Sequence, residues 1–200
     1  MQMGATRIRE IVLSLRNFSR LDEADMKSVD IHEGIESTLL ILQNRLNKKA
    51  AHSAIQVIKK YGKLPLVECY PGQLNQVFMN ILTNAIDALE DRHRPQTQIK
   101  ENSSTIIIVT EVIDCDWIRI RIADNGTGVT EEVRSKLFDP FFTTKPVGSG
   151  TGLGLSISYQ IVVEKHGGQV QCVSAPGQGA EFIIEIPIKH KNRQKSSAII

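Results

Sequence analysis

The composition of this 200-residue chain is that of a globular protein, because 41% of its residues are hydrophobic and 23% are charged, which is enough apolar material to fill a core. Its formal net charge of +2 argues against a general attraction to nucleic acid or acidic lipid. Its three cysteines form no C-x-x-C pair and indicate neither a disulfide scaffold nor a zinc site. The sequence has neither a leader nor an apolar run of the ~18 residues that a membrane helix needs. We therefore expect a cytoplasmic chain that contacts neither nucleic acid nor membrane, although its parent protein could be membrane-anchored.

The first segment has the spacing of an amphipathic helix. Its apolar residues follow the i, i+3, i+4, i+7 pattern of one helical face: Ile8, Ile11, Val12, Leu15 and Phe18. Such a helix needs a partner on another chain, on an upstream segment or on the body of the domain. The polar stretch 21–28 indicates a hinge, so we assign residues 1–27 to this helix and its hinge.

Hydrophobic periodicity and turn residues predict the elements of a main domain over 28–188. In chain order they are a helix over 33–46, short strands at 54–58 and 66–70, a long helix from Pro71 to about Leu89, strands at 105–112 and 117–124, a helix over 153–165, and strands at 169–174 and 181–187. Because helices cluster early and strands pair through short turns, we predict an α+β sandwich with helices on one face of a sheet. Residues 189–200 are basic and predict a disordered tail.

The polar side of the long helix carries amides in a row. Gln76, Asn80 and Asn84 recur every four residues and Asp87 follows, so all four share one stripe opposite the apolar one. Their oxygens suit a magnesium ion that itself holds phosphate. The same residues would also fit a solvated helix face whose amides make local hydrogen bonds.

The strand predicted at 117–124 ends in a carboxylate, and two glycines follow it closely. An ionised Asp124 only accepts hydrogen bonds, so it matches the exocyclic amine of adenine. Guanine would present a carbonyl there, at a cost of roughly 1–3 kcal/mol if the contact is buried. Gly126 and Gly128 would let the backbone approach a flat ligand. An ordinary Asp-Asn-Gly turn is the alternative.

Four glycines alternate along 148–154 and lead into the helix over 153–165. Their backbone N–H groups can point inward together, which suits a polyphosphate. The segment is neither a Walker loop nor a Rossmann fingerprint. A flexible linker would explain the glycines but not their position directly before the helix.

The segment FDPFFTTK at 138–145 holds three of the six phenylalanines. Such an apolar loop must pack against another part of the molecule. It is either a local hydrophobic cluster or a lid that closes over bound nucleotide and brings Lys145 near the phosphates.

In this order and spacing, the four segments resemble the motifs of the ATP-binding catalytic domain of sensor histidine kinases, within the gyrase–chaperone–kinase–MutL superfamily. The helix at 75–89 resembles the N box, DNGTG the first glycine box, FDPFFTTK the phenylalanine box, and GSGTGLGLS the second glycine box. The resemblance covers about 28–188. The opening segment looks like the second helix of the kinase dimerisation domain.

The resemblance implies a mixed, mostly antiparallel sheet backed by about three helices, and a site for ATP and Mg²⁺. It implies Asn84 as the main magnesium ligand with Asn80 beside it, and these two together with Lys145 as catalytic residues. The nucleotide-binding residues that it implies are Asn84, Asp87, Ala88, Asp124, Gly126, Gly128, Val129, Phe138, Thr144, Gly150, Thr151, Gly152, Leu153 and Gly154.

The activity implied is transfer of the γ-phosphoryl group of ATP to a histidine on a dimerisation helix, followed by relay to the receiver domain of a response regulator. The full-length protein would then be a homodimer. Gln76 occupies the position where we expect a catalytic glutamate in ATP-hydrolysing members of the superfamily, and a neutral amide cannot deprotonate water. The alternatives are an ATP-hydrolysing clamp, a serine-directed kinase of the same superfamily, or a non-catalytic nucleotide-binding dimerisation module.

The acceptor histidine should lie on a helix that this chain lacks. His32 precedes Glu33, as an acceptor would precede an acidic residue, but it follows the second dimerisation helix instead of preceding it. We therefore expect that this chain alone cannot autophosphorylate.

Overall fold

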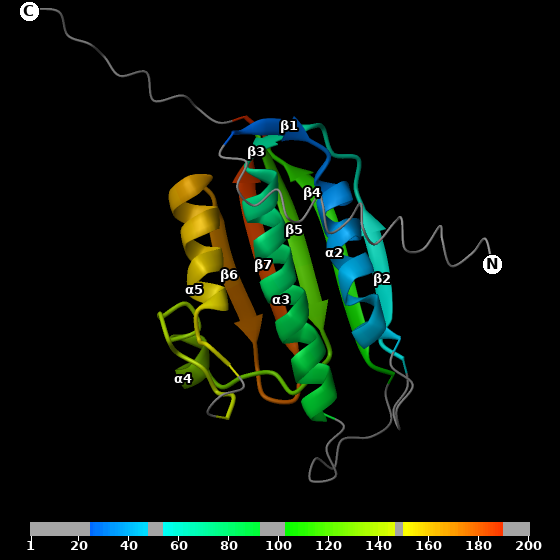
Figure 1. Ribbon diagram of the computed structural model, residues 1–200, viewed down its shortest axis with the longest axis vertical. Coiled ribbons are helices and arrows are strands. Elements are labelled where there is room, and N and C mark those ends of the chain that lie inside the picture. The colour runs from blue at the N-terminus through cyan, green and yellow to red at the C-terminus, as the bar shows by residue number, and fades with distance from the viewer. Residues whose placement is uncertain (1–24, 48–53, 93–102, 147–149, 190–200) are drawn as a thin grey trace, which may run out of the picture.

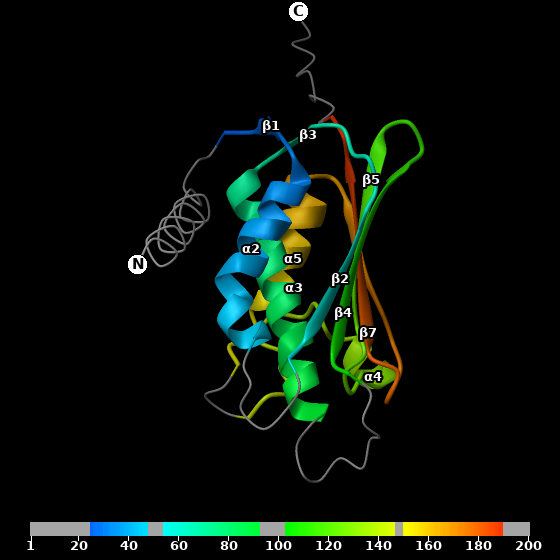
Figure 2. The same ribbon diagram turned by 90° about the vertical axis from the view of Figure 1, so that its right-hand side faces the viewer.

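The computed structural model describes residues 25–47, 54–92, 103–146 and 150–189. In this part of the chain a five-stranded sheet forms one layer, and the helices over 31–46, 71–92 and 154–165 form the other, on one face of the sheet (Figures 1 and 2). The predicted two-layer α+β sandwich is thus confirmed. The predicted helix over 7–20 and residues 190–200 of the predicted tail lie outside the described residues.

The sheet is mixed and mostly antiparallel, as the resemblance implied. Its strand order is β2 (Gln56–Tyr61), β4 (Thr105–Ile113), β5 (Trp117–Asp124), β7 (Ala180–Pro187) and β6 (Gln169–Ser174). Only the β2–β4 pair within this sheet is parallel. The central strand β5 ends at Asp124, so strand pairing on both sides fixes the position of this residue.

A second, two-stranded sheet lies at one end of the domain. Its antiparallel strands are β1 (Lys27–Val29) and β3 (Val67–Cys69). Strand β1 falls where the sequence predicted a hinge. The difference arises because β1 is specified by its pairing with a distant segment and not by a local pattern.

Alternation along the strands separates a buried face from a polar one. Ile118, Ile120 and Ile122 of β5 are buried beneath the helices. On the opposite face, Arg119 Nε donates to Glu185 at 2.7 Å, and Arg121 pairs with Glu181 at the same distance. Cross-strand ion pairs therefore cover the sheet face that the helices leave open.

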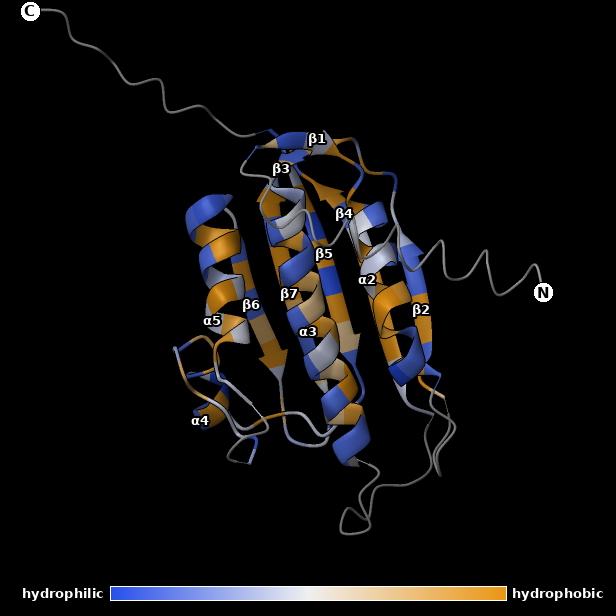
Figure 3. Cartoon of the chain, in the orientation of Figure 1, coloured by the Kyte–Doolittle hydropathy of each residue, from blue (hydrophilic) through white to orange (hydrophobic). Residues whose placement is uncertain are grey.

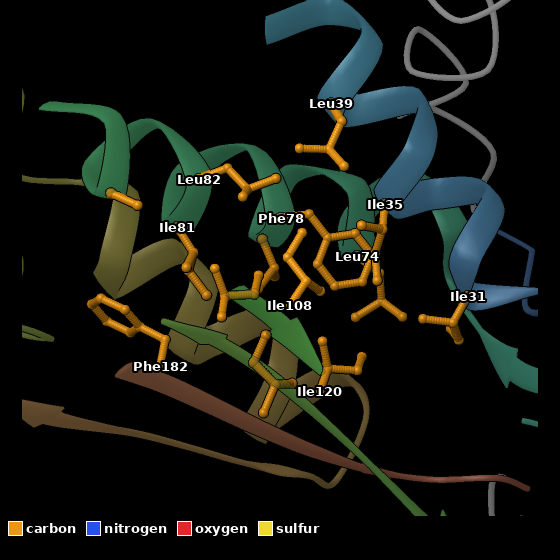
Figure 4. Packing of buried hydrophobic residues seen from close by; sticks show 14 of the residues in the cluster. Ile31, Ile35, Leu39, Leu74, Phe78, Ile81, Leu82, Ile108, Ile120 and Phe182 are labelled. Carbon is orange, nitrogen blue, oxygen red and sulfur yellow. The ribbon is translucent and has the colours of Figure 1, made fainter. Parts of the chain in front are cut away.

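Helices α2 (Ile31–Leu46) and α3 (Pro71–Arg92) pack side by side on the sheet. The predicted apolar stripe of α3 is buried at all seven positions: Leu74, Val77, Phe78, Ile81, Leu82, Ala85 and Leu89. Figure 4 shows part of this stripe between α2 and the strands, and Figure 3 shows hydrophilic residues on the same helices. The burial of one stripe therefore directs the polar stripe of α3 away from the core.

The third helix changes its winding along its length. It begins as α5 (Gly154–Tyr159) and continues as a π-helical segment, η2 (Gln160–Lys165), where the sequence predicted one regular helix. The His166 N–H donates to the Ile161 carbonyl, five residues back, at 3.2 Å. The buried imidazole of His166 donates from Nδ1 to the same carbonyl and accepts at Nε2 from the Tyr70 N–H. This histidine thus joins the end of η2 to the segment that precedes α3.

A short helix that the sequence did not predict, α4 (Glu131–Arg134), follows β5 and is capped by Thr130. No helix within the described ranges is long and apolar enough to cross a membrane.

Candidate functional site

The predicted site segments meet at one cleft with a volume of about 850 Å³. It lies at the end of the domain where α3 ends and α4 begins, the lower end in Figure 1. Its walls come from the polar stripe of α3, the end of β5 with the turn at 127–129, and the loop segments 142–146 and 150–155. Cys172, Ala180 and Phe182 of β6 and β7 complete the lining.

Most of the predicted site residues line this cleft. They are Asn80, Asn84, Asp87, Ala88, Asp124, Gly128, Val129, Thr144, Lys145, Gly150, Thr151, Gly152 and Gly154. Three predicted residues do not: Gly126, Phe138 and Leu153. Phe138 packs against the core and lies 5.8 Å from Tyr159 between ring centroids, while Leu153 directly precedes α5.

The two asparagines of α3 differ in their contacts. Asn80 Nδ2 donates to the Gly154 carbonyl at 2.8 Å and to Ser158 Oγ at 3.1 Å. Asn80 therefore holds the start of α5 against α3. Asn84 Oδ1 lies 3.4 Å from Lys145 Nζ, so this amide oxygen faces a cation.

Gln76 does not line the cleft, which changes the argument that the sequence drew from it. Two neutral amides of α3, Asn80 and Asn84, line the cleft, where Asn80 donates to the Gly154 carbonyl and Asn84 lies beside Lys145. They cannot take a proton from water. Because three carboxylates of α3, Asp87, Glu90 and Asp91, line the same cleft, the identity of Gln76 no longer argues against hydrolysis.

Asp124 forms the opposite wall, where its side chain is only 9% exposed. Its Oδ1 accepts a hydrogen bond from the Gly126 N–H at 2.8 Å, which fixes the orientation of the carboxylate. Burial raises the pKa of Asp124 to about 6, although the N–H groups of Gly126 and Ala180 favour the charged form. The carboxylate is therefore mainly ionised at pH 7 and can act as an acceptor.

The glycines after Asp124 are needed for packing. A Cβ on Gly126 would lie 2.8 Å from the Ala88 Cβ, and a Cβ on Gly128, where φ is +62°, would lie 2.1 Å from the Ala175 carbonyl oxygen. The sequence assigned both glycines to close approach by a base. In the structure Gly126 lets the turn approach α3, and Gly128 lets it approach the β6–β7 loop.

The two loop segments of the cleft also contact each other closely. Gly152 has φ +67°, and a Cβ there would lie 2.4 Å from the carbonyl carbon of Phe141. Phe141 itself has φ +65° and is 75% exposed. Phe142, its neighbour, lines the cleft, so the phenylalanine-rich segment forms part of the site and is more than a local cluster.

Sequence reasoning missed several lining residues. They are Thr83, Glu90, Asp91, Thr127, Leu137, Phe142, Thr143, Pro146, Leu155, Cys172, Ala180 and Phe182. Those on α3 are helical neighbours of the predicted stripe and could have been found from the 3.6-residue period. The residues of β6 and β7 could not, because their place depends on the strand order.

His32 lies outside the cleft, near the start of α2. Its Nε2 is 2.9 Å from Thr110 Oγ1, and its ring stacks on Tyr61 with 4.3 Å between centroids. The imidazole thus connects the N-terminal end of α2 to strands β2 and β4.

A cleft between an asparagine-bearing helix and glycine-rich loops, on this kind of sandwich, defines an ATP-binding domain. The family model described as histidine kinase-, DNA gyrase B- and HSP90-like ATPase matches residues 69–190. The chain therefore belongs to this family. Among the similar proteins described next, AtoS and ThkA are histidine kinases by name, which confirms the resemblance that the motifs indicated.

Two curated relatives define this likeness in sequence. The chain is 35% identical over 151 residues to Sporulation kinase E of Bacillus subtilis, covering 75% of this chain and 19% of that protein. It is 31% identical over 188 residues to the signal transduction histidine-protein kinase AtoS of Escherichia coli, covering 94% and 28%. The chain thus spans less than a third of the length of these relatives.

Solved structures agree with the fold. The catalytic domain of histidine kinase ThkA is 28% identical, with a TM-score of 0.66 over 82% of this chain and 98% of that one. Full-length ShkA, solved in complex with AMPPNP, is 26% identical, with a TM-score of 0.67 over 90% of this chain and 36% of that one. ThkA in complex with the response regulator TrrA is 24% identical, with a TM-score of 0.65 over 96% and 50%, and at this identity shows the fold alone.

Proposed function

We propose that this chain is the ATP-binding catalytic part of a two-component sensor histidine kinase. It transfers the γ-phosphoryl group of ATP to a histidine on a dimerisation helix, from which the group passes to the receiver domain of a response regulator. The observation that carries this proposal is that Asp124 and Asn84 line the same cleft, together with the glycine-rich segment 150–154. The ShkA complex with a nucleotide analogue supports the ligand.

The base-binding part of the proposed site is the wall around Asp124. Its ionised carboxylate accepts a hydrogen bond from the exocyclic amine of adenine, while the Gly126 N–H holds the carboxylate in place. Phe182 and Cys172 supply less polar surface beside it. This chemistry favours adenine over guanine, because guanine would present a carbonyl oxygen to the carboxylate of Asp124, and both groups only accept hydrogen bonds.

The phosphate-binding part lies between α3 and the two loop segments. Asn84 would hold Mg²⁺ through Oδ1, a hard oxygen ligand that already faces the ammonium of Lys145. When bound, the ion neutralises charge on the phosphate oxygens. Asn80 fixes the start of α5 and, with it, the end of the glycine-rich segment.

The chain itself would mainly position the reactants, as in other phosphoryl transfers. An imidazole nitrogen of the acceptor forms a bond to the γ-phosphorus, the bond from that phosphorus to its bridging oxygen breaks, and ADP leaves with the electron pair. Because the acceptor is the nucleophile, the cleft needs no serine or cysteine nucleophile. Cys172 fits this view, since burial raises the pKa of its thiol to about 12 and keeps it protonated.

The decisive experiment mixes this chain, radiolabelled ATP and a separately supplied dimerisation helix pair that carries an acceptor histidine. We expect label on the helix pair in a form that is labile to acid and stable to base. Acid-stable label would indicate a serine-directed kinase. Steady phosphate release without an acceptor would indicate an ATP-hydrolysing clamp, and ATP binding without transfer would indicate a non-catalytic module.

A further inference from the structure

The ammonium of Lys145 lies beside the amide oxygen that the proposed site assigns to magnesium. Lys145 Nζ is 3.4 Å from Asn84 Oδ1 and contacts the carboxylate of Asp87, about one turn further along α3. All three residues line the cleft. Because Lys145 belongs to the loop segment 142–146, its ammonium joins this loop to the polar stripe of α3.

A magnesium ion on Asn84 Oδ1 and an ammonium at this position exclude each other. Magnesium binds its oxygen ligands at about 2.1 Å. With Nζ 3.4 Å from the same oxygen, the two cations would lie at most about 5.5 Å apart. This separation is shorter than the Debye length of about 8 Å, so salt would screen their repulsion little. The contact of Lys145 and the proposed metal contact therefore belong to two different arrangements of the cleft.

We propose that Lys145 and the metal ion occupy Asn84 alternately. In one arrangement, which the structure shows, Asp87 and Asn84 hold the ammonium of Lys145. In the other, Asn84 Oδ1 binds the metal ion and Lys145 binds the phosphates of the nucleotide. The inference rests on the proposed function, because it requires a cleft that binds the metal complex of a triphosphate.

The side chain of Lys145 can reach both positions. Its stem lies along the glycine-rich segment, since a Cβ on Gly150 would be 3.2 Å from the Cβ and from the Cδ of Lys145. The side chain is 33% exposed, and a lysine stem is long and flexible. Rotations within this stem can therefore carry the ammonium from α3 to the proposed phosphate site while the backbone of the loop stays in place.

Arg45 lowers the cost of this exchange. Its Nη2 donates to Asp87 Oδ1 at 2.6 Å, while Lys145 contacts the other oxygen of the same carboxylate. A partly buried carboxylate that loses its only cation would oppose the departure of Lys145. Asp87, whose side chain is 24% exposed, keeps Arg45 as a partner when Lys145 leaves.

Binding of a metal ion alone tests the first arrangement, with Mn²⁺ as a paramagnetic probe that takes similar oxygen ligands. The relaxation of water protons gives the Mn²⁺ affinity of the whole chain without nucleotide. We expect Lys145→Met to raise this affinity by about tenfold, because the removed charge lies beside the oxygen that binds the metal. Adding Asn84→Ala should abolish the gain. Lys136→Met is the matched control, since it removes the same charge outside the cleft lining and should leave the affinity unchanged.

Calorimetric titration with Mg·ATP tests the second arrangement. We expect Lys145→Met to weaken Mg·ATP binding by about tenfold, because the phosphates lose a charge-assisted contact. One substitution thus has opposite effects on the two ligands. A merely structural role would weaken both, and a role in phosphate binding alone would leave the Mn²⁺ affinity unchanged. Thermal unfolding establishes that each variant is folded, and Lys145→Gln replaces Lys145→Met if the latter does not fold.

The outcomes separate this inference from the proposed function. An unchanged or weaker Mn²⁺ affinity in Lys145→Met would overturn the inference, as would a gain that persists after Asn84→Ala. Unchanged or tighter binding of Mg·ATP would also overturn it, because Lys145 would then not bind the phosphates. If the unaltered chain does not bind Mg·ATP, the proposed function itself fails, whereas the Mn²⁺ titrations still show whether Lys145 competes with a metal ion.

Discussion

Replacing Asp124 by asparagine removes a negative charge that is buried at the end of β5. Burial raises the pKa of this carboxyl from 3.8 to about 6, and each unit corresponds to about 1.4 kcal/mol. The ionised carboxylate therefore costs the folded domain about 3 kcal/mol at neutral pH. Asparagine keeps an oxygen for the Gly126 N–H but buries an amide NH₂, which offsets part of the gain. We expect Asp124→Asn to stabilise the ligand-free domain by about 1–2 kcal/mol, or about 2–8 °C in Tm.

The pH dependence of this effect follows from the direction of the shift. Because the pKa of Asp124 is higher in the folded than in the unfolded chain, the folded state binds more protons between about pH 4 and pH 6. The stability that this group contributes is therefore greatest below pH 4 and is lost as the pH rises to about 6. The advantage of Asp124→Asn should accordingly be full at pH 7.5 and smaller by about 1 kcal/mol at pH 5.

The same substitution should remove most of the affinity for ATP, since asparagine presents either a neutral oxygen or an amide NH₂ to the adenine amine. Urea unfolding at pH 7.5 and pH 5 gives the stabilities, and calorimetric titration gives the affinities. Asp114→Asn is the matched control, since it removes the same charge in the β4–β5 turn, where φ is +53° and asparagine is tolerated. A variant that is less stable than the parent at pH 7.5 would refute the reasoning about burial. Unchanged ATP affinity would remove Asp124 from the site.

Three further substitutions test other parts of the structure. Asn84→Ala should lose magnesium-dependent ATP binding and keep the fold, as calorimetry with and without Mg²⁺ and thermal unfolding can measure. His166→Leu should lower the free energy of unfolding by about 1–3 kcal/mol in urea, because the Tyr70 N–H loses its acceptor and the Ile161 carbonyl keeps only the backbone N–H of residue 166. Gly152→Ala should weaken ATP binding more than Gly177→Ala does: both residues have positive φ, but only at Gly152 would the added methyl meet another segment, the backbone of Phe141.

Local patterns predicted the elements that bury one regular face. The apolar stripe of α3 and the alternation of Ile118, Ile120 and Ile122 in β5 gave correct elements, because burial of one face imposes a period that the sequence must follow. The same periods placed the polar stripe of α3 and the end of β5, from which the two walls of the cleft come. The sequence could therefore predict which side of a helix or strand a residue occupies wherever burial in the core fixes the orientation of that element.

Features that depend on contacts between distant segments could not be predicted in this way. Strand β1 exists through its pairing with Val67–Cys69, and the π-helical segment is tied to the contact between His166 and Tyr70. Cys172 and Phe182 reach the cleft only because β7 lies next to β5 in the sheet and β6 lies next to β7. No local period in the sequence carries this information.

The two asparagines of α3 have the same side chain but different contacts, because different segments of the chain pack beside them. Asn80 and Asn84 are chemically identical and lie one turn apart on the same face, and the resemblance implied Asn84 as the main magnesium ligand with Asn80 beside it. The start of α5 lies against Asn80 and takes its amide hydrogens, whereas the ammonium of Lys145 lies beside the amide oxygen of Asn84. Since a metal ion needs an oxygen and packing of α5 needs a donor, each amide uses a different end of the same group. In the proposed site, Asn80 would therefore act on the ligand chiefly through the glycine-rich segment that it holds in place, and Asn84 would act on it directly.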